Sequence, residues 1–253
     1  MSRSPVNRRD PSGTKRIEKD EIERQHFIIG QYMEAMREQI REHPLDKERN
    51  QEVCGRLVDA MSRDIEGAAD DWIHNAEQAA IKNTDRVFKN LRVDIKLADQ
   101  SYLTPGEAAE LRRSVVNCVT RFDRPTAEIV ADIIADGYLE GEGSDEITRR
   151  ICNRFDDTEG DLKTNAERAV RTETMKICDK VNLARYEAAG VTRFYSYPTA
   201  DDRCCPECIS NATNGQPGGK LYLYTAGELT LPWHPNCRCC RLPYIEGDEV
   251  LTI

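Results

Sequence analysis

Six of the ten cysteines and one of the four histidines lie between Asp201 and Cys240. The remaining cysteines stand singly in helical patterns, where a cysteine usually behaves as a small buried apolar group; they are Cys54, Cys118, Cys152 and Cys178. A chain of 253 residues can bury its own core without covalent staples. The cluster therefore indicates a metal site, with a disulfide pair as the alternative.

The spacing within the cluster predicts the ligands. Cys205 and Cys208 form a Cys-x-x-Cys pair, and His234 and Cys237 form a His-x-x-Cys pair. Two such pairs of nitrogen and sulfur ligands suit tetrahedral zinc. Cys237 is favoured for the fourth position because it pairs with His234, and Cys239 remains the alternate ligand.

The segment between the two pairs, residues 209–233, is rich in Gly, Pro and Asn and contains the alternating stretch KLYLY. This pattern predicts a β-hairpin held over the metal. A redox role for the Cys-x-x-Cys pair is not expected, because such motifs open a helix within a βαβ unit and no such pattern is present here.

The metal is expected to be structural, and the protein is expected not to be an enzyme. A catalytic zinc keeps an open position and needs a general base nearby, but His234 is the single histidine of residues 191–253. We therefore assign no catalytic residues and no organic cofactor.

Charge and hydropathy exclude two classes of partner. The net charge is −9, and residues 1–16, with five Lys or Arg against one Asp, form a short basic tail. Strong binding of nucleic acid is not expected apart from this tail, because phosphate binding needs a basic face. The chain lacks an apolar run near the ~18 residues of a membrane span and an apolar signal region at its start, so we expect a protein made in the cytoplasm that binds no membrane.

Upstream of the cluster the pattern is helical. Between Pro11 and Pro44 one apolar stripe is spaced by three, four and seven residues; it consists of Ile22, Ile29, Met33, Met36 and Ile40. Thr104 and Glu107 form a capping box with Pro105 at the first helical position. Further on, Ser144 is expected to cap a short helix.

A second capping box, Thr164 to Glu167, is expected to open a separate helix that ends at Gly190. Apolar and small residues predict one buried face on it, and Glu173 flanks that face. A buried carboxylate needs a partner, so we expect Glu173 to clamp this helix to the C-terminal module through Arg203 or Arg238, a surface position being the alternative.

The predicted fold is mainly α with a small α+β C-terminal domain, in which a long helix packs on a zinc-stabilised β-hairpin module. The expected division is a flexible basic tail at 1–16, a helical region at 17–125 and a domain at 126–253. The zinc module is expected at about 191–243.

Residues 130–243 resemble the phage Mu F-like minor head proteins, also called phage head morphogenesis proteins. The resemblance rests on an ordered set of segments: YLEGEGSDEITRRI, AERAVRTET, NLARYEAAGV, DDRCCPEC, GKLY and LPWHPNCRC. The helix signature falls on Arg171, Thr172 and Glu173, and Cys204 and Cys240 are additional to the family pattern. The metal-like positions of the family fall on Cys205, Cys208, His234, Cys237 and Cys239.

The resemblance implies a non-enzymatic minor head protein of a tailed virus or prophage, made in the host cytoplasm and located in the head interior. Its implied partners are the portal protein, the major capsid protein, or further copies of itself at the portal vertex. The alternatives are a His-Asn-His-type metal-dependent nuclease and a cellular zinc-binding adaptor.

Overall fold

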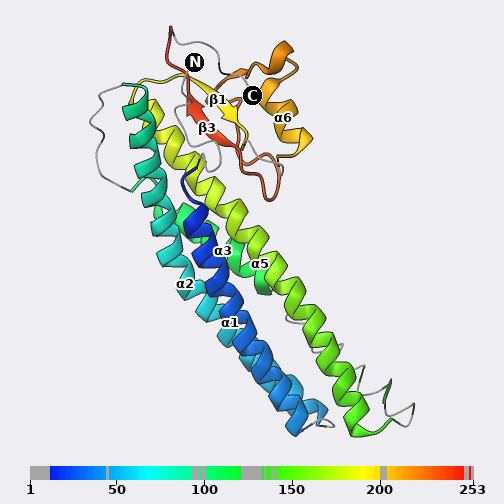
Figure 1. The fold of residues 1–253 in the computed structure, drawn as a ribbon. Coiled ribbons are helices and arrows are strands. Elements are labelled where there is room, and N and C mark those ends of the chain that lie inside the picture. Colours follow the sequence, from blue (N-terminus) through cyan, green and yellow to red (C-terminus); the bar gives the residue numbers. More distant parts are fainter. Residues whose placement is uncertain are drawn as a thin grey trace. The chain divides into compact units, whose positions relative to one another are not determined.

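The computed structural model describes residues 12–43, 46–92, 97, 101–120, 133, 136–137, 140, 142–199, 204–247 and 251. The long helices are α1 (Lys15–Glu42), α2 (Lys47–Asn90), α3 (Pro105–Thr120) and α5 (Ser144–Ala188). The C-terminal region adds strands β1 (Arg193–Tyr197), β2 (Leu223–Thr225) and β3 (Cys240–Pro243), helix α6 (Pro206–Thr213) and the 3-10 turn η1 (Pro217–Gly219) (Figure 1). The prediction of a mainly α fold with a small C-terminal α+β region is confirmed. None of the described helices is long and apolar enough to cross a membrane.

The chain forms two compact units, and both are discontinuous in sequence. Unit 1 contains residues 1–19, 71–111 and 170–253, and unit 2 contains residues 20–70 and 112–169. Each unit therefore combines segments from both sides of residue 125, whereas the predicted division is linear. Residues 1–11 of the predicted basic tail lie outside the described residues, while Ser12 and Thr14 are buried.

Unit 2 is built around the apolar stripe of α1. The predicted stripe is largely confirmed, since its last four members are fully buried; they are Ile29, Met33, Met36 and Ile40. Ile22 is only half-buried, and Glu21 and Gln25 continue the buried face toward the N-terminus. Arg37 of α1 donates to Asp156 at 2.6 Å and to Glu159 at 2.7 Å, so a buried guanidinium joins α1 to the first half of α5.

Helix α5 is one continuous helix, not two as predicted. Thr164 does not cap a new helix, because its hydroxyl donates to the carbonyl of Gly160 one turn earlier, at 2.9 Å. The predicted end at Gly190 is confirmed: this residue has φ +79°, and the N–H of Val191 donates to the carbonyl of Tyr186 at 2.9 Å. That bond and the left-handed glycine are the two marks of a Schellman motif. The capping box of α3 also forms, with the Thr104 N–H 2.9 Å from Glu107 Oε2 and the Glu107 N–H 3.3 Å from Thr104 Oγ1.

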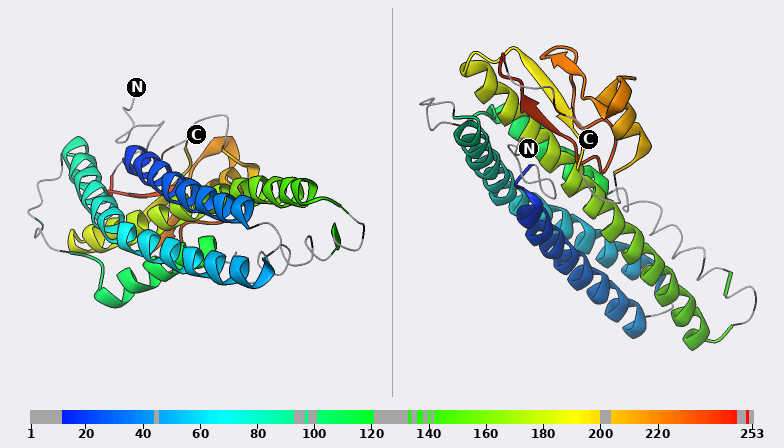
Figure 2. Two further views of the ribbon diagram at one scale, coloured as in Figure 1. Left: turned by 90° about the horizontal axis from the view of Figure 1, so that it is seen from below. Right: turned by 45° about the horizontal axis from the view of Figure 1, so that its top comes forward.

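In unit 1 the strands form an antiparallel sheet in the order β2-β1-β3. The predicted hairpin within residues 209–233 is wrong. Tyr224 of the KLYLY stretch pairs with Phe194 of β1, and the segment between the cysteine pairs begins with helix α6. On the other side of β1, Tyr197 pairs with Cys240. In the right view of Figure 2 the strands lie beside the C-terminal part of α5.

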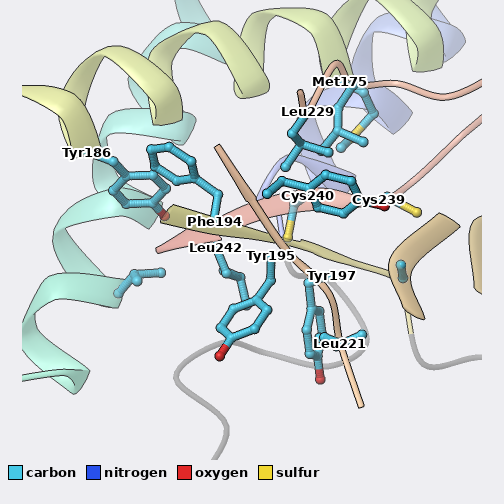
Figure 3. Close-up of a cluster of buried hydrophobic side chains, with 14 of the residues drawn as sticks. Met175, Tyr186, Phe194, Tyr195, Tyr197, Leu221, Leu229, Cys239, Cys240 and Leu242 are labelled. Atoms are coloured by element: carbon cyan, nitrogen blue, oxygen red, sulfur yellow. The ribbon is translucent and has the colours of Figure 1, made fainter. Parts of the chain in front are cut away.

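The core of unit 1 lies on both faces of this sheet. Phe194 stacks on Tyr186 of α5, with ring centroids 6.2 Å apart, whereas Tyr195 and Tyr197 point to the opposite face (Figure 3). This alternation follows from the two-residue period of a strand. Both faces are therefore apolar, and the small sheet is buried on the helix side and beneath its own loops.

Candidate metal site

The predicted ligands converge in unit 1. His234 Nε2 lies 3.1 Å from the sulfur of Cys205 and 3.1 Å from that of Cys208, and the sulfurs of Cys208 and Cys237 are 3.7 Å apart. Among the described residues the donor atoms form two groups, within each of which all atoms lie within 4.8 Å; these are Cys205, Cys208 and His234, and Cys208, Cys237 and Cys239. The two groups share Cys208. Together they could hold a metal ion.

The first pair of ligands is positioned by the start of α6. Cys205 is the N-cap of this helix, and its sulfur accepts from the N–H of Cys208 at 3.3 Å, while Pro206 occupies the first helical position. That N–H holds the pKa of the Cys205 thiol below its usual value. The expectation that this motif does not open a helix is therefore wrong, although the surrounding sheet is antiparallel and not a βαβ unit.

The second pair is positioned by a tight turn. The N–H of Cys237 donates to the carbonyl of His234 at 3.0 Å, and Asn236 has a left-handed φ of +63°. His234 Nδ1 lies 2.8 Å from the carbonyl of Pro235, which accepts its proton. This bond raises the pKa of His234 and leaves Nε2, the atom that faces the sulfurs, as the available ligand atom.

Cys237 and Cys239 differ in their electrostatic surroundings. Hydrogen bonds from the Cys208 and Cys239 thiols lower the pKa of Cys237 to about 2, whereas contact with Cys208 and Cys237 raises that of Cys239. The 3.7 Å between Cys208 and Cys237 matches the sulfur separation of about 3.7 Å that a tetrahedron with zinc–sulfur bonds of about 2.3 Å requires. This distance favours Cys237 as ligand, and the choice stays a prediction.

Cobalt substitution tests this choice. We expect Cys237→Ser to lower the thiolate-to-cobalt charge-transfer absorbance by about one third, because the ion loses one of three sulfur ligands. Cys239→Ser, the matched control, should leave that absorbance unchanged. A loss in the Cys239 variant with none in the Cys237 variant would exchange the two assignments.

One face of α5 contacts the segments that carry the candidate metal ligands. Thr172, Asp179 and Tyr186 are spaced by seven residues, about two helical turns, and so share a face. Thr172 Oγ1 accepts from the N–H of Asn236 at 3.1 Å, and Tyr186 stacks on Phe194. Sequence reasoning missed this face, although the seven-residue spacing was visible in the sequence.

At the middle of this face, Asp179 and Arg241 form a buried bidentate ion pair. The Nε and Nη2 atoms of Arg241 lie 2.9 and 3.0 Å from the two carboxylate oxygens of Asp179. Arg241 also donates to the carbonyl of Leu229 at 2.6 Å and lies over the ring of Phe194. Burial raises the pKa of Asp179, and the guanidinium opposes that rise.

Glu173 is buried, as expected, with 4% of its surface exposed. Its carboxylate lies 2.8 Å from Nζ of Lys176 on the same helix. Of the two partners predicted for it, Arg203 lies outside the described residues. An ion pair between Asp179 and Arg241 joins α5 to the C-terminal module.

The structure does not contain the disulfide that was the alternative to a metal site at the described cysteines of the cluster. The thiols of Cys205, Cys208, Cys237 and Cys239 are free. Comparisons with protein-family models, with curated proteins and with solved structures found no match to this chain.

Proposed function

We propose that unit 1 holds one structural zinc ion, with Cys205, Cys208, His234 and Cys237 as ligands. The support is the donor set itself, because clustered thiols and an imidazole suit zinc better than the oxygen-seeking ions. Cys208 and Cys237 are buried, and the proposed ion would have four protein ligands. Such a closed site contributes stability and leaves no position for a reacting water.

On this basis we also propose that the chain is a non-enzymatic minor head protein of a tailed virus or prophage. One observation carries the proposal: segments on which the family resemblance rests contact one another. Thr172 of the RTET segment bonds Asn236 of the HPNC segment, whose His234 meets Cys205 and Cys208 of the CPEC segment. A functional resemblance carried by contacting residues is stronger than one carried by scattered matches.

The proposed partner is the portal protein or the inner capsid surface, bound through protein surfaces in the head interior. The net charge of −9 supports this choice, because an acidic protein is repelled by packaged DNA. The long helices of unit 2 offer extended faces for partner helices.

Co-expression with the portal gene from the same genome tests the partner. We expect the two proteins to elute as a complex on size-exclusion chromatography. Cys208→Ser should weaken this complex only in proportion to the unfolding of unit 1 that it causes. A chain that elutes alone, beside a correctly assembled portal, would contradict the proposed partner. Metal-dependent cleavage of DNA by the pure protein, abolished by a folded His234→Ala variant, would establish the nuclease alternative instead.

A further inference from the structure

The turn that carries His234 and Cys237 adopts a conformation that needs support. Asn236, at its centre, has φ +63°, a left-handed conformation that non-glycine residues adopt at a cost. The turn closes on itself through the bond from the Cys237 N–H to the His234 carbonyl. The N–H of Asn236 is directed outward from this turn, toward helix α5.

The hydroxyl oxygen of Thr172 accepts a hydrogen bond from that N–H. Its Oγ1 lies 3.1 Å from the backbone nitrogen of Asn236, which stands between the two ligands of the turn. The bond joins residues 64 positions apart and fixes the peptide between Pro235 and Asn236, in the middle of the turn. We infer that Thr172 is a positioning residue of the metal site: through Asn236 it holds the His-Pro-Asn-Cys turn in the metal-binding conformation, so that metal affinity depends on helix α5.

The inference rests on the proposed metal site and adds to it a thermodynamic link. If the docked turn binds the ion more tightly than the undocked turn, the ion must in return strengthen docking on α5 by the same factor. Groups that orient metal ligands typically change metal affinity by about 10- to 100-fold when they are lost. Thr172 thereby gains a role within the RTET segment that its position on a long helix does not reveal.

The second threonine of that segment provides a matched control. Thr174 lies on the same helix, is fully buried, and accepts a hydrogen bond from Trp72 Nε1 at 3.1 Å, away from the turn. Thr→Val at either position removes one hydroxyl of one helix. At Thr174 the loss affects packing between α2 and α5, and at Thr172 it affects the metal turn.

The experiment loads the full-length protein with zinc and follows transfer of the ion to a chromogenic chelator. We expect Thr172→Val to release zinc about tenfold faster than wild type. Thr172→Ser, which keeps the hydroxyl, should restore the wild-type rate. Thr174→Val should lower the melting temperature and release zinc at the wild-type rate.

Three results separate the claims. If Thr172→Val releases zinc at the wild-type rate, the inference is overturned, while the proposed metal site stands. Equal acceleration by Thr174→Val would also overturn it, because the effect would then be general loss of stability. A wild-type protein that takes up no zinc would refute the proposed metal site itself.

Discussion

Removing the metal is expected to unfold the sheet and α6 while the helices of unit 2 stay folded. Structural zinc contributes an apparent free energy of about 10–16 kcal/mol in small peptides, as much as the whole stability of a typical domain. The strands β1 to β3 are short, and the segments that carry the ligands, α6 and the His234 turn, meet around the donor atoms. Hydrogen exchange followed by mass spectrometry, with and without chelator, resolves the two units separately.

Cys208→Ser should reproduce the effect of the chelator. Cys208 belongs to both groups of donor atoms and is buried, so its loss affects every arrangement of ligands. Cys204→Ser is the control, because Cys204 lies beside the site but belongs to neither group. Protection of β1 and β3 that persists in the Cys208 variant would show that the sheet folds without metal.

Asp179→Ala is expected to destabilise unit 1 by about 3–5 kcal/mol, because it leaves a buried guanidinium without its carboxylate. Arg241 is 1% exposed, so water cannot replace the lost partner. Denaturant unfolding, monitored by the fluorescence of Trp72 and Trp233 in unit 1, measures the change. A loss below about 0.5 kcal/mol, the scale of a surface substitution, would contradict the ion pair as a clamp.

The double variant Asp179→Leu with Arg241→Met separates the charge from the contact. Replacing a buried ion pair by apolar residues of similar volume is often neutral or stabilising. We therefore expect the double variant to be more stable than Asp179→Ala. Some stability is still lost relative to wild type, because the carbonyl of Leu229 no longer accepts a hydrogen bond from residue 241. A double variant less stable than the single variant would mean that Arg241 contributes chiefly through its other contacts.

Local signals of the sequence were read correctly where one short segment decides the structure. The capping box at Thr104 and the glycine stop at Gly190 each depend on side chains and dihedral angles within a few residues. The Thr164 capping box failed because its pattern is also compatible with the interior of a helix. There, a threonine hydroxyl bonds the carbonyl one turn back, and α5 continues through it.

The small sheet was misread for a different reason. KLYLY alternates as a strand should, but alternation does not identify the partner strand, and β1 lies far upstream in the sequence. Cysteine is also not among the preferred N-cap residues, so the residue type at position 205 did not predict the start of a helix there.

The sequence predicted that Cys205, Cys208, His234 and Cys237 gather in one region, because such spacing is typical of metal sites; it did not predict the helix and the turn that carry them. The contacts that dock the module were not foreseen, since Asp179 and Arg241 are 62 residues apart and only the tertiary fold brings them together. The seven-residue spacing of Thr172, Asp179 and Tyr186 would have identified the docking face, though not its partners.

The most direct test of the account is the zinc content of the protein purified without chelator, measured by elemental analysis against protein concentration. The account predicts one zinc per chain in the wild type and in Cys204→Ser, and much less in Cys205→Ser and Cys208→Ser. A folded wild-type protein that contains no zinc, with β1 and β3 protected from hydrogen exchange, would contradict it.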